Sequence, residues 1–499
     1  MHALLALPLL LLQGEQVEQP LEKKALLVFV DGFIPEAIAK TRTRTLDGLL
    51  EHAAYSYAAR AESTTISGSG WSTFLTGVHW DKHGVPDNAF KSPDYERYPH
   101  VFARLKQARP DSYCASAQCW EPIERGLVAP GGADKRSYHD YYAYNEDYFD
   151  ADSADTLCVD DMVGFLAEPE LDLSVMMFGE LDGVGHTESN AHYHAGDPLY
   201  GKMLTKIDVE LGRLMAAIRA RKTYAQEDWL IIISSDHGGA RGSGHGKNIP
   251  AHRRMPLIVS GASVTPGEIW PPPQAVDIVP TVLHHLGVEV KPEWGIDGRV
   301  VGFASSAPPV AALDVNLVFN GDGEFERGFR HYVGAPDASI AGWDDPGEMT
   351  LLVYGSEGPF PGKEDKLPLE NGANYFAGGG AAADSHITQT IDLTPLKKTI
   401  RAGADCELSA WLGGYLAEED SAAFSATFFD KSGQALDHYG VGPLTPAERG
   451  KASGFEPRSV RGPVPKGTTR VVVQLLAKAS SGSNDGYADN LSLVLSARD

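Results

Sequence analysis

The sequence predicts an α/β fold: a mostly parallel sheet with helices on both faces, followed by a C-terminal antiparallel β-sandwich. Three long apolar runs predict the sheet, because near-continuous apolar strands are typical of strands buried on both faces. They are ALLVFV before Asp31, LSVMMFGEL before Asp182 and WLIIISS before Asp236. Apolar residues at helical spacing over residues 203–218 predict a crossover helix between the second and third runs.

The second half of the chain has a different residue pattern. An Ala, Ser and Pro-rich stretch predicts a linker at residues 304–314, after a first domain at residues 22–303. Short alternating segments such as CELSAWLGGYL and TRVVVQLLA follow, separated by Gly, Asp and Pro turns. This pattern is typical of an antiparallel sandwich, which we expect at residues 315–499.

The chain opens on a short apolar stretch, Ala3 to Leu12, followed by polar residues. It is shorter than the roughly 20 residues of a spanning helix, and its position predicts a signal peptide at residues 1–15. A frayed N-terminal segment is the alternative. We therefore expect a secreted or periplasmic protein without a transmembrane segment.

The composition limits which binding partners and which disulfide bonds can be expected. The net charge is -24, with 43 Lys and Arg against 67 Asp and Glu, which argues against binding a nucleic-acid polymer. The 4 cysteines are too few for a disulfide scaffold and lack the spacing of a zinc ribbon. In an exported protein, Cys114 and Cys119 are candidates for one disulfide.

Acidic residues and histidines gather at the predicted strand ends. Asp31 and Asp182 end two of the apolar runs, His186 follows Asp182 within DGVGH, and Asp236 and His237 end the third run. Parallel strands present their carboxyl ends at one edge of a sheet, so these residues are expected to converge. Carboxylate and imidazole bind divalent ions, and two such clusters are typical of a two-metal phosphoesterase. A further histidine, His245, lies in the glycine-rich loop GGARGSGHG.

A candidate nucleophile precedes a short predicted helix. Ser67 begins SGSGWSTFLTG, after the strand-like segment YSYAARAES. A serine at a helix N-terminus meets an incoming phosphate beside free backbone N–H groups, and a bound metal ion stabilises its alkoxide. The alternative is that Ser67 only caps the helix.

Several motifs, taken in order, resemble the alkaline phosphatase superfamily, particularly its nucleotide pyrophosphatase/phosphodiesterase and related phosphomonoesterase branches. They are VFVDGF, the Ser67 segment through HGV, ELDGVGHT, SSDHGG, GHG, MPLIVSG and VDIVPTVLHHLGV, within about residues 23 to 303. Each motif is modest alone, but their order along the chain is specific.

The resemblance implies two divalent metal ions, expected to be Zn²⁺, and a small-molecule phosphoester as substrate. It assigns one ion to Asp31, Ser67, Asp236 and His237. It assigns the other to Asp182, His186 and a third histidine, for which we expect His245, with His252 and His285 as competitors. The implied course is in-line attack by Ser67, a phosphoseryl intermediate and release by a metal-bound hydroxide.

Substrate contacts are less defined by the sequence. Phosphodiesterase members often carry an Asn donor three residues after the nucleophile, where this chain has Gly70. Trp120 is a candidate for stacking on a leaving group. Three basic residues are candidates for contacting a dianion, against an ordinary surface or packing role: Arg241, Lys247 and Arg253. We expect His192 and His194 at the rim and a structural hydrogen bond from Asp208.

Three alternatives to a phosphomonoesterase or phosphodiesterase remain. Sulfatases share the fold, but their nucleophile motif contains Pro and Arg, and neither occurs from Ser67 to Trp71. A phosphonate hydrolase is the other alternative of the same fold. A glycan-binding protein with an inactive front domain is the alternative of a different class, and retention of the nucleophile and paired ligands argues against it.

The predicted sandwich resembles galactose-binding-like jelly rolls through NLVFNGDGEFERGF near its start and NDGYADNLSLVL at its end. In such domains the two ends lie side by side and often share a calcium ion. Glu324 and Asp489 are oxygen donors of the kind that Ca²⁺ prefers, although Asn, Asp and Gly clusters are also ordinary turn residues. Glycan binding by this domain is a further expectation.

Overall fold

The computed structural model describes residues 21–140, 148–150, 152–304, 310–325, 328–330, 340–344, 349–356, 360–362, 365–369, 371–381 and 383–498. The predicted signal peptide lies outside these residues, as does much of the predicted linker. Among the described residues, no helix combines the length and the apolar composition needed to cross a membrane.

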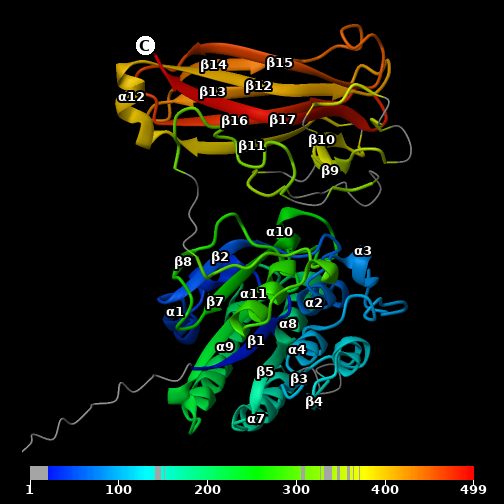
Figure 1. Ribbon diagram of the computed structural model, residues 1–499, viewed down its shortest axis with the longest axis vertical. Helices are drawn as coiled ribbons and strands as arrows, with labels where there is room; N and C mark the ends of the chain where they lie inside the picture. Colours follow the sequence, from blue (N-terminus) through cyan, green and yellow to red (C-terminus); the bar gives the residue numbers. More distant parts are fainter. Residues whose placement is uncertain are drawn as a thin grey trace, which may run out of the picture.

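The N-terminal half contains an eight-stranded sheet with the order β4-β3-β5-β1-β6-β7-β2-β8 (Figure 1). Its strands are β1 Glu22–Val30, β2 Ala53–Arg60, β3 Tyr113–Gln118, β4 Lys135–Tyr138, β5 Leu171–Phe178, β6 Glu227–Ser234, β7 Arg254–Ser260 and β8 Gly267–Glu268. The neighbours β5, β1 and β6 are parallel, and β7 is antiparallel to both β6 and β2. Strand β2 therefore runs in the same direction as β6. The prediction of a mostly parallel sheet is confirmed.

The three predicted apolar runs form the centre of this sheet. Every residue of β5 and β6 is buried, and so are the last seven residues of β1. Such strands have no solvated face, which explains why the sequence shows continuous apolar runs and not alternation.

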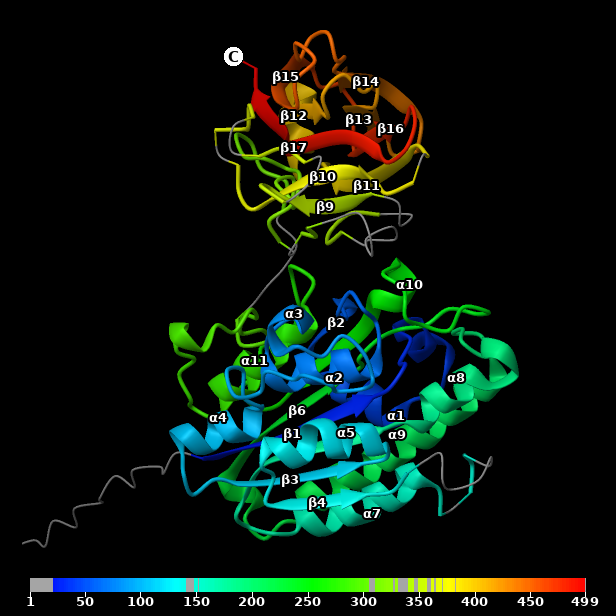
Figure 2. The same cartoon turned by 90° about the vertical axis from the view of Figure 1, so that its right-hand side faces the viewer.

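Helices form the remaining layers (Figures 1 and 2). Helices α7 and α9 pack against each other, while α2 packs against α11, which also contacts α4. The helices of this half are α1 Arg44–Leu50, α2 Ser67–Thr76, α3 Trp80–His83, α4 Val101–Ala108, α5 Glu121–Ile123, α6 Ala129–Gly131, α7 Ala154–Leu166, α8 Glu180–Asn190, α9 Pro198–Arg219, α10 Pro250–Arg253 and α11 Ile278–His285. Short 3-10 or π turns occupy Pro35–Lys40, Glu124–Val128, Tyr224–Gln226, Ala275–Asp277, Pro292–Trp294 and Thr394–Leu396.

The predicted crossover helix is α9, which connects β5 to β6. Asp197 caps its N-terminus by accepting hydrogen bonds from Leu199 N and Tyr200 N, and Pro198 occupies the first helical position, where no N–H is needed. Its apolar stripe is buried, which orients the end of β5 and the start of β6 relative to each other.

The C-terminal half forms two antiparallel sheets, and the predicted β-sandwich is confirmed (Figure 1). One sheet has the order β15-β12-β17-β10-β9 and the other β11-β16-β13-β14. The elements are β9 Thr350–Val353, β10 Asn374–Gly379, β11 Ser385–Asp392, α12 Lys397–Ala402, β12 Ala404–Gly414, β13 Ser421–Phe429, β14 Ala435–Val441, β15 Gly454–Pro463, β16 Arg470–Lys478 and β17 Asn484–Ala497. Residues 314–317 pair with β17, so the start and the end of this half lie side by side.

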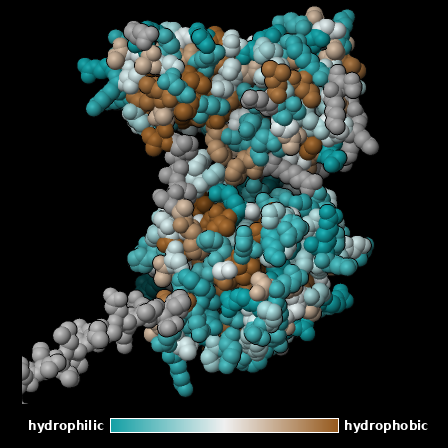
Figure 3. All heavy atoms as spheres, viewed as in Figure 1, coloured by the Kyte–Doolittle hydropathy of each residue, from teal (hydrophilic) through white to brown (hydrophobic). Residues whose placement is uncertain are grey.

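The two halves have separate hydrophobic cores among the described residues. Buried residues of the first core lie between Ala25 and Val301, and those of the sandwich lie between Ala311 and Leu495. The domain limits 22–303 and 315–499 remain predictions. The face seen in Figure 3 is largely hydrophilic over the N-terminal half, in keeping with the charge of the chain.

All 4 cysteines are buried and free. The possible disulfide between Cys114 and Cys119 is therefore not formed. Burial also raises the pKa of the Cys114 thiol to about 12, which makes this side chain an unreactive part of the core.

Candidate active site

Four chain segments meet beyond the carboxyl ends of the central strands. Asp31 follows β1 and Asp236 follows β6, and these strands are neighbours. Asp182 lies in the first turn of α8, just after β5, the other neighbour of β1. Ser67 begins α2, after β2. The topology therefore brings residues distant in sequence to one edge of the sheet.

The first cluster contains Asp31, Asp236 and His237, all buried. His237 Nε2 lies 3.4 Å from Asp31 Oδ1 and 3.3 Å from Asp236 Oδ2. Ser67 Oγ lies 3.4 Å from the same Nε2 atom. The candidate nucleophile is thus at the first cluster, as the resemblance implies.

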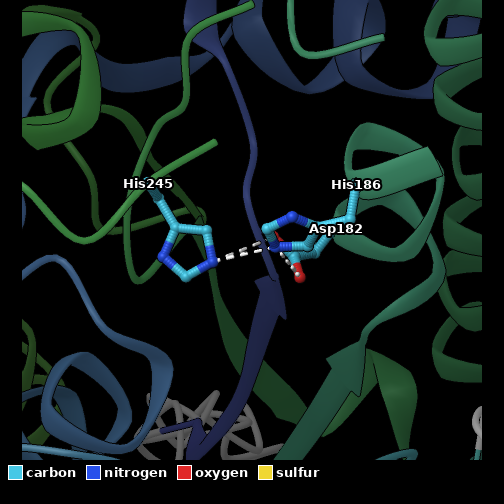
Figure 4. A group of neighbouring side chains, drawn as sticks. All are labelled: Asp182, His186 and His245. Atoms are coloured by element: carbon cyan, nitrogen blue, oxygen red, sulfur yellow. Dashed lines mark hydrogen bonds and ion pairs between the residues drawn. The ribbon is translucent and has the colours of Figure 1, made fainter. Parts of the chain in front are cut away.

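The second cluster contains Asp182, His186 and His245 (Figure 4). Asp182 and His186 are one turn apart on α8, with His186 Nε2 at 3.3 Å from Asp182 Oδ2. His245 approaches from the opposite side, and its Nε2 lies 3.0 Å from His186 Nε2 and 3.8 Å from Asp182 Oδ1. The His237 and His245 rings stack with centroids 3.7 Å apart, so the two clusters are adjacent.

The histidines of both clusters are oriented in the same way. Nδ1 of each ring donates to a carbonyl oxygen: His186 to Asn190 Oδ1 at 2.7 Å, His237 to Gly238 O at 2.8 Å and His245 to Thr65 O at 2.8 Å. A carbonyl oxygen only accepts, so Nδ1 carries a proton in each ring, and Nε2 is the nitrogen left to bind a cation. This is the arrangement of metal-binding imidazoles.

Several buried ligand atoms in the clusters lack hydrogen-bond partners, which shows whether cations would fit there. Asp31 Oδ1 and Asp236 Oδ2 are buried without a hydrogen-bond partner, and both face His237 Nε2. The facing Nε2 atoms of His186 and His245 cannot both accept. A divalent cation in each cluster satisfies these lone pairs, so the residues fit two metal ions, and oxygen and nitrogen donors of this kind suit zinc and similar ions.

The carboxylates repel one another in the absence of cations. Burial and the nearby charges of Asp236 and Asp182 raise the pKa of Asp31 well above its ordinary range. Burial and the charge of Asp182 raise the pKa of Asp236 to about 7. Burial also raises the pKa of Asp182, but the His186 hydrogen bond and the nearby imidazoles bring the net pKa below the ordinary value. A cation in each cluster would offset this repulsion, so the carboxylates favour cation binding.

The two competing histidines lie elsewhere. His252 Nε2 pairs with Ser243 Oγ at 3.0 Å and its Nδ1 accepts from Lys247 N, so it organises the loop that carries His245. His285 Nε2 hydrogen-bonds Lys24 O and Asp228 O, near the opposite ends of β1 and β6. Of the three candidates, only His245 joins Asp182 and His186.

Backbone strain beside Ser67 holds the His245 loop. Thr65 has a φ of 43°, which is unusual for a β-branched residue. This conformation points Thr65 O at His245 Nδ1 and Gly246 N, while Thr65 Oγ1 donates to Lys247 O. The strained residue thereby links the nucleophile segment to the second cluster.

Ser67 is the first residue of α2, and Ile66, not Ser67, occupies the N-cap position. The capping alternative is therefore not observed. Instead, Asn88 Oδ1 accepts from Gly68 N at 2.8 Å, which places an exposed amide at the mouth of the helix beside Ser67. Sequence analysis missed Asn88, because its sequence spacing from Ser67 gives no local signal of contact.

Gly70 and Trp120 are both packed within the fold, and the substrate contacts considered for them from the sequence stay predictions. A Cβ atom at Gly70 would lie 2.8 Å from both Asp236 Cβ and Asp236 O, so this glycine allows α2 to pack against the first cluster. Trp120 is 9% exposed and belongs to the hydrophobic core, which leaves little of its ring for stacking.

The three basic candidates divide by burial. Arg241 and Lys247 are exposed on the loop around His245. Arg253 is buried, donates to Ala61 O and Asn248 Oδ1, and so has a structural role.

His192, His194 and Asp208 belong to neither cluster. The His192 and His194 rings face Asp197, at 3.0 Å and 3.7 Å, and not the clusters. Asp208 accepts from Thr45 N and Leu46 N, as a structural hydrogen-bonding residue at the start of α1.

The residues considered for calcium already have hydrogen-bond donors. Glu324 Oε1 accepts from Asn374 N at 2.7 Å, and Asp489 Oδ2 accepts from Tyr354 Oη at 2.7 Å. Burial raises the pKa of Asp489 to about 7, with a smaller contribution from the charge of Glu324. A calcium ion between them remains a prediction.

Residues 25–256 match the family described as Type I phosphodiesterase / nucleotide pyrophosphatase. Ectonucleotide pyrophosphatase/phosphodiesterase family member 7 of Homo sapiens is 26% identical over 231 residues, which are 44% of this chain and 48% of that protein. The matched region thus spans about half the length of this curated relative.

Solved structures with similar chains include murine ectonucleotide pyrophosphatase/phosphodiesterase 5, in an inactive form with AMP, at 13% identity and a TM-score of 0.43; the match covers 54% of this chain and 96% of that one. A phosphonate monoester hydrolase from Silicibacter pomeroyi is 12% identical, with a TM-score of 0.45 and coverage of 73% and 87%.

Proposed function

We propose that this protein is an exported phosphomonoesterase or phosphodiesterase of the alkaline phosphatase superfamily that acts through Ser67. The match of residues 25–256 to the Type I phosphodiesterase / nucleotide pyrophosphatase family supports this proposal. The position of Ser67 Oγ at 3.4 Å from His237 Nε2, at the start of α2, carries the proposal.

The residues divide the work as follows. Asp31, Asp236 and His237 hold one cation, and Asp182, His186 and His245 hold the other. Bound divalent ions supply charge neutralisation for the phosphoryl oxygens and lower the pKa of coordinated hydroxyl groups.

Ser67 Oγ gives up its proton and forms a bond to phosphorus, while the bond from phosphorus to the leaving alcohol breaks and the alcohol takes up a proton. Water then forms a bond to phosphorus and breaks the bond to Ser67 Oγ, which regains its proton. The N-terminus of α2 stabilises the negative charge of the phosphoryl group.

Asn88 supplies the side-chain donor that Gly70 cannot. Its Oδ1 is held by Gly68 N at 2.8 Å, which leaves the Nδ2 hydrogens available at the same helix mouth. A donor in this place stabilises a phosphoryl oxygen as charge develops.

The nucleophile is tested by replacing it. Purified full-length protein should contain close to two equivalents of transition metal, because both clusters fit a cation. Ser67→Ala should lower kcat by roughly 10³-fold or more and retain the metal. Ser72→Ala is the matched control, since Ser72 lies on the same helix but hydrogen-bonds Gly68 O and Tyr95 Oη. Protein without metal, or full turnover by Ser67→Ala, would rule the proposal out.

The substrate class is tested with one chromogenic alcohol. We expect turnover of its phosphomonoester or its phosphodiester to exceed that of its phosphonate monoester and its sulfate. Preference for the phosphonate or the sulfate would instead support the alternatives of the same fold. No turnover by metal-loaded protein would support a binding protein with an inactive domain.

Export follows from the predicted signal peptide. Expression of the full chain in a Gram-negative host should release a mature protein that begins near residue 16. N-terminal sequencing of the product, with a variant carrying Lys in place of Leu9 as the control, tests this expectation.

The sandwich offers a candidate glycan site. A groove of about 770 Å³ lies on the outer face of the sheet that contains β15, β12 and β17. Ser459, Ser409 and Ser492 are in register across these strands, and Trp411 lines the same groove. Hydroxyl groups beside an indole ring suit a neutral saccharide. Trp411→Ala should abolish binding on a glycan array, and an array without hits would exclude this role.

A further inference from the structure

Tyr193 is a fully buried residue beside the metal site that neither cluster includes. Its hydroxyl donates to Asp182 Oδ1. Its ring centroid lies 5.3 Å from that of His186 and 6.3 Å from that of His245. This side chain therefore contacts the second cluster without having the position of a third ligand.

Three glycines form the slot that holds the Tyr193 ring. Gly32 directly follows Asp31, Gly185 directly precedes His186, and Gly239 lies two residues after His237. A Cβ atom at Gly185 would lie 2.6 Å from Tyr193 Cε2, and one at Gly239 would lie closer still to the ring. At Gly32, the nearest atom would be the Tyr193 hydroxyl. Each of the three ligand-bearing segments that follow the central strands thus has a glycine, without a side chain, where it contacts this ring.

We propose that Tyr193 is a positioning residue that sets how Asp182 binds its cation. This inference rests on the proposed function. The phenol occupies Asp182 Oδ1, while Asp182 Oδ2 lies 3.3 Å from His186 Nε2, toward the centre of the cluster. Asp182 therefore presents one oxygen to the cation. The ring also fixes the spacing between loops that carry ligands of both clusters.

The energetic reason is preorganisation. A carboxylate free to rotate loses side-chain entropy when it binds a cation, and a buried hydrogen bond removes that freedom in advance. Hydrogen bonds from residues behind a ligand typically change metal affinity by 10- to 100-fold.

Tyr200 provides a matched control. It is also fully buried, and its hydroxyl donates to Gly32 O at 2.6 Å and accepts from Ile34 N at 2.9 Å. Its partners are backbone groups only. Loss of the Tyr200 hydroxyl therefore removes buried hydrogen bonds of similar kind without releasing a ligand carboxylate.

The test compares full-length wild type, Tyr193→Phe and Tyr200→Phe. Each protein is stripped with a chelator, checked by circular dichroism, and titrated with Zn²⁺ against a chromophoric competitor. We expect Tyr193→Phe to weaken one of two sites by about 10- to 100-fold. Tyr200→Phe should lower thermal stability and leave both affinities unchanged.

A titration with Co²⁺ reports the coordination directly. Release of Oδ1 in Tyr193→Phe allows both oxygens of Asp182 to bind. The visible absorption of Co²⁺ at that site should then fall, because Co²⁺ of higher coordination number absorbs more weakly than tetrahedral Co²⁺. Tyr193→Met, whose flexible side chain fills an irregular slot, is the second variant without the hydroxyl.

The outcomes separate the two proposals. If Tyr193→Phe and Tyr193→Met bind two Zn²⁺ ions as tightly as wild type and Tyr200→Phe do, the role of Tyr193 is overturned. The proposed function would still stand. Wild-type protein that binds no Zn²⁺ would instead overturn the two-metal function on which this inference rests.

Discussion

At the scale of single residues, hydrogen bonds on one atom of a side chain determine which other atom is available in the site. Each cluster histidine donates through Nδ1 to a carbonyl oxygen, which directs Nε2 into the site. Asn88 follows the same logic, because its Oδ1 is held and its Nδ2 is available. A hydrogen bond on one atom of a side chain thereby assigns the chemistry of the other.

Asn88→Ala should lower kcat by about 10²- to 10³-fold, the usual effect of removing one donor to a developing oxyanion. Asn88→Asp is the more specific variant, because it retains the oxygen that accepts from Gly68 N but has no N–H to donate. Steady-state kinetics of both variants would show a loss of kcat. An Asn88→Asp enzyme with full kcat would contradict the donor role.

Gly70→Ala and Gly164→Ala should have opposite effects, although both glycines lie inside helices. A Cβ at Gly70 would press on Asp236, and we expect a loss of about 1–3 kcal/mol of unfolding free energy together with loss of metal. A Cβ at Gly164 in α7 meets nothing within 4 Å, so we expect a gain of roughly 0.5–1 kcal/mol. Urea unfolding measures both, and equal effects would contradict this account.

At the scale of elements, histidines buried in the neutral form hold helix ends near the site. His100 Nδ1 caps α4 by accepting from Phe102 N, and His83 Nδ1, at the end of α3, accepts from Val85 N. Burial lowers the pKa of His100 to about 3 and that of His83 to about 4. A protonated Nδ1 can no longer accept. Each backbone N–H would then face another N–H donor, and the hydrogen bond would be lost.

This predicts acid destabilisation with a defined sign. The ordinary pKa of 6.5 applies in the unfolded chain, so the unfolded state takes up protons first as the pH falls. The contribution of these histidines is complete above pH 6.5 and declines as the pH falls toward 4 and 3. In His100→Asn, which keeps a capping side chain, the unfolding free energy should fall less steeply with pH. Equal slopes for wild type and variant would contradict the prediction.

At the scale of the whole molecule, the separate hydrophobic packing of the two halves predicts two unfolding transitions, and the clusters that contain Asp31 and Asp182 both lie in the N-terminal half. A chelator selective for transition metals should lower the melting temperature of the N-terminal transition, because the buried Asp31 and Asp236 then lose the cations that bind the folded state. A ligand at a thousand times its Kd stabilises by about 4 kcal/mol, so the shift should be large. The sandwich transition should not move, because this chelator leaves Ca²⁺ in place.

Differential scanning calorimetry of metal-loaded and chelated protein measures both transitions. Ser67→Ala serves as the control, since it keeps the carboxylate and imidazole ligands of both clusters and should show a similar shift. A chelator effect on both transitions, or on neither, would contradict the assignment of the metals to the N-terminal core.

The local pattern of the sequence was sufficient for the architecture and for the list of candidate ligands. Continuous apolar runs specify strands buried on both faces, and alternation specifies a sandwich, because each pattern follows from the solvation of a single strand. The acids at the ends of β1 and β6 could be chosen for the same reason. The resemblance then supplied their pairing into two sets, with three histidines left to compete.

Only the tertiary structure selected among alternatives that are equivalent along the chain. His245, and not His252 or His285, joins the second cluster because strained Thr65 holds its loop. Asn88 and Tyr193 reach the site through contacts across the fold, and Gly70 allows α2 to pack closely against Asp236. Sequence patterns report whether a residue prefers water or the core. Which buried partners it meets depends on the packing of segments far apart in the chain.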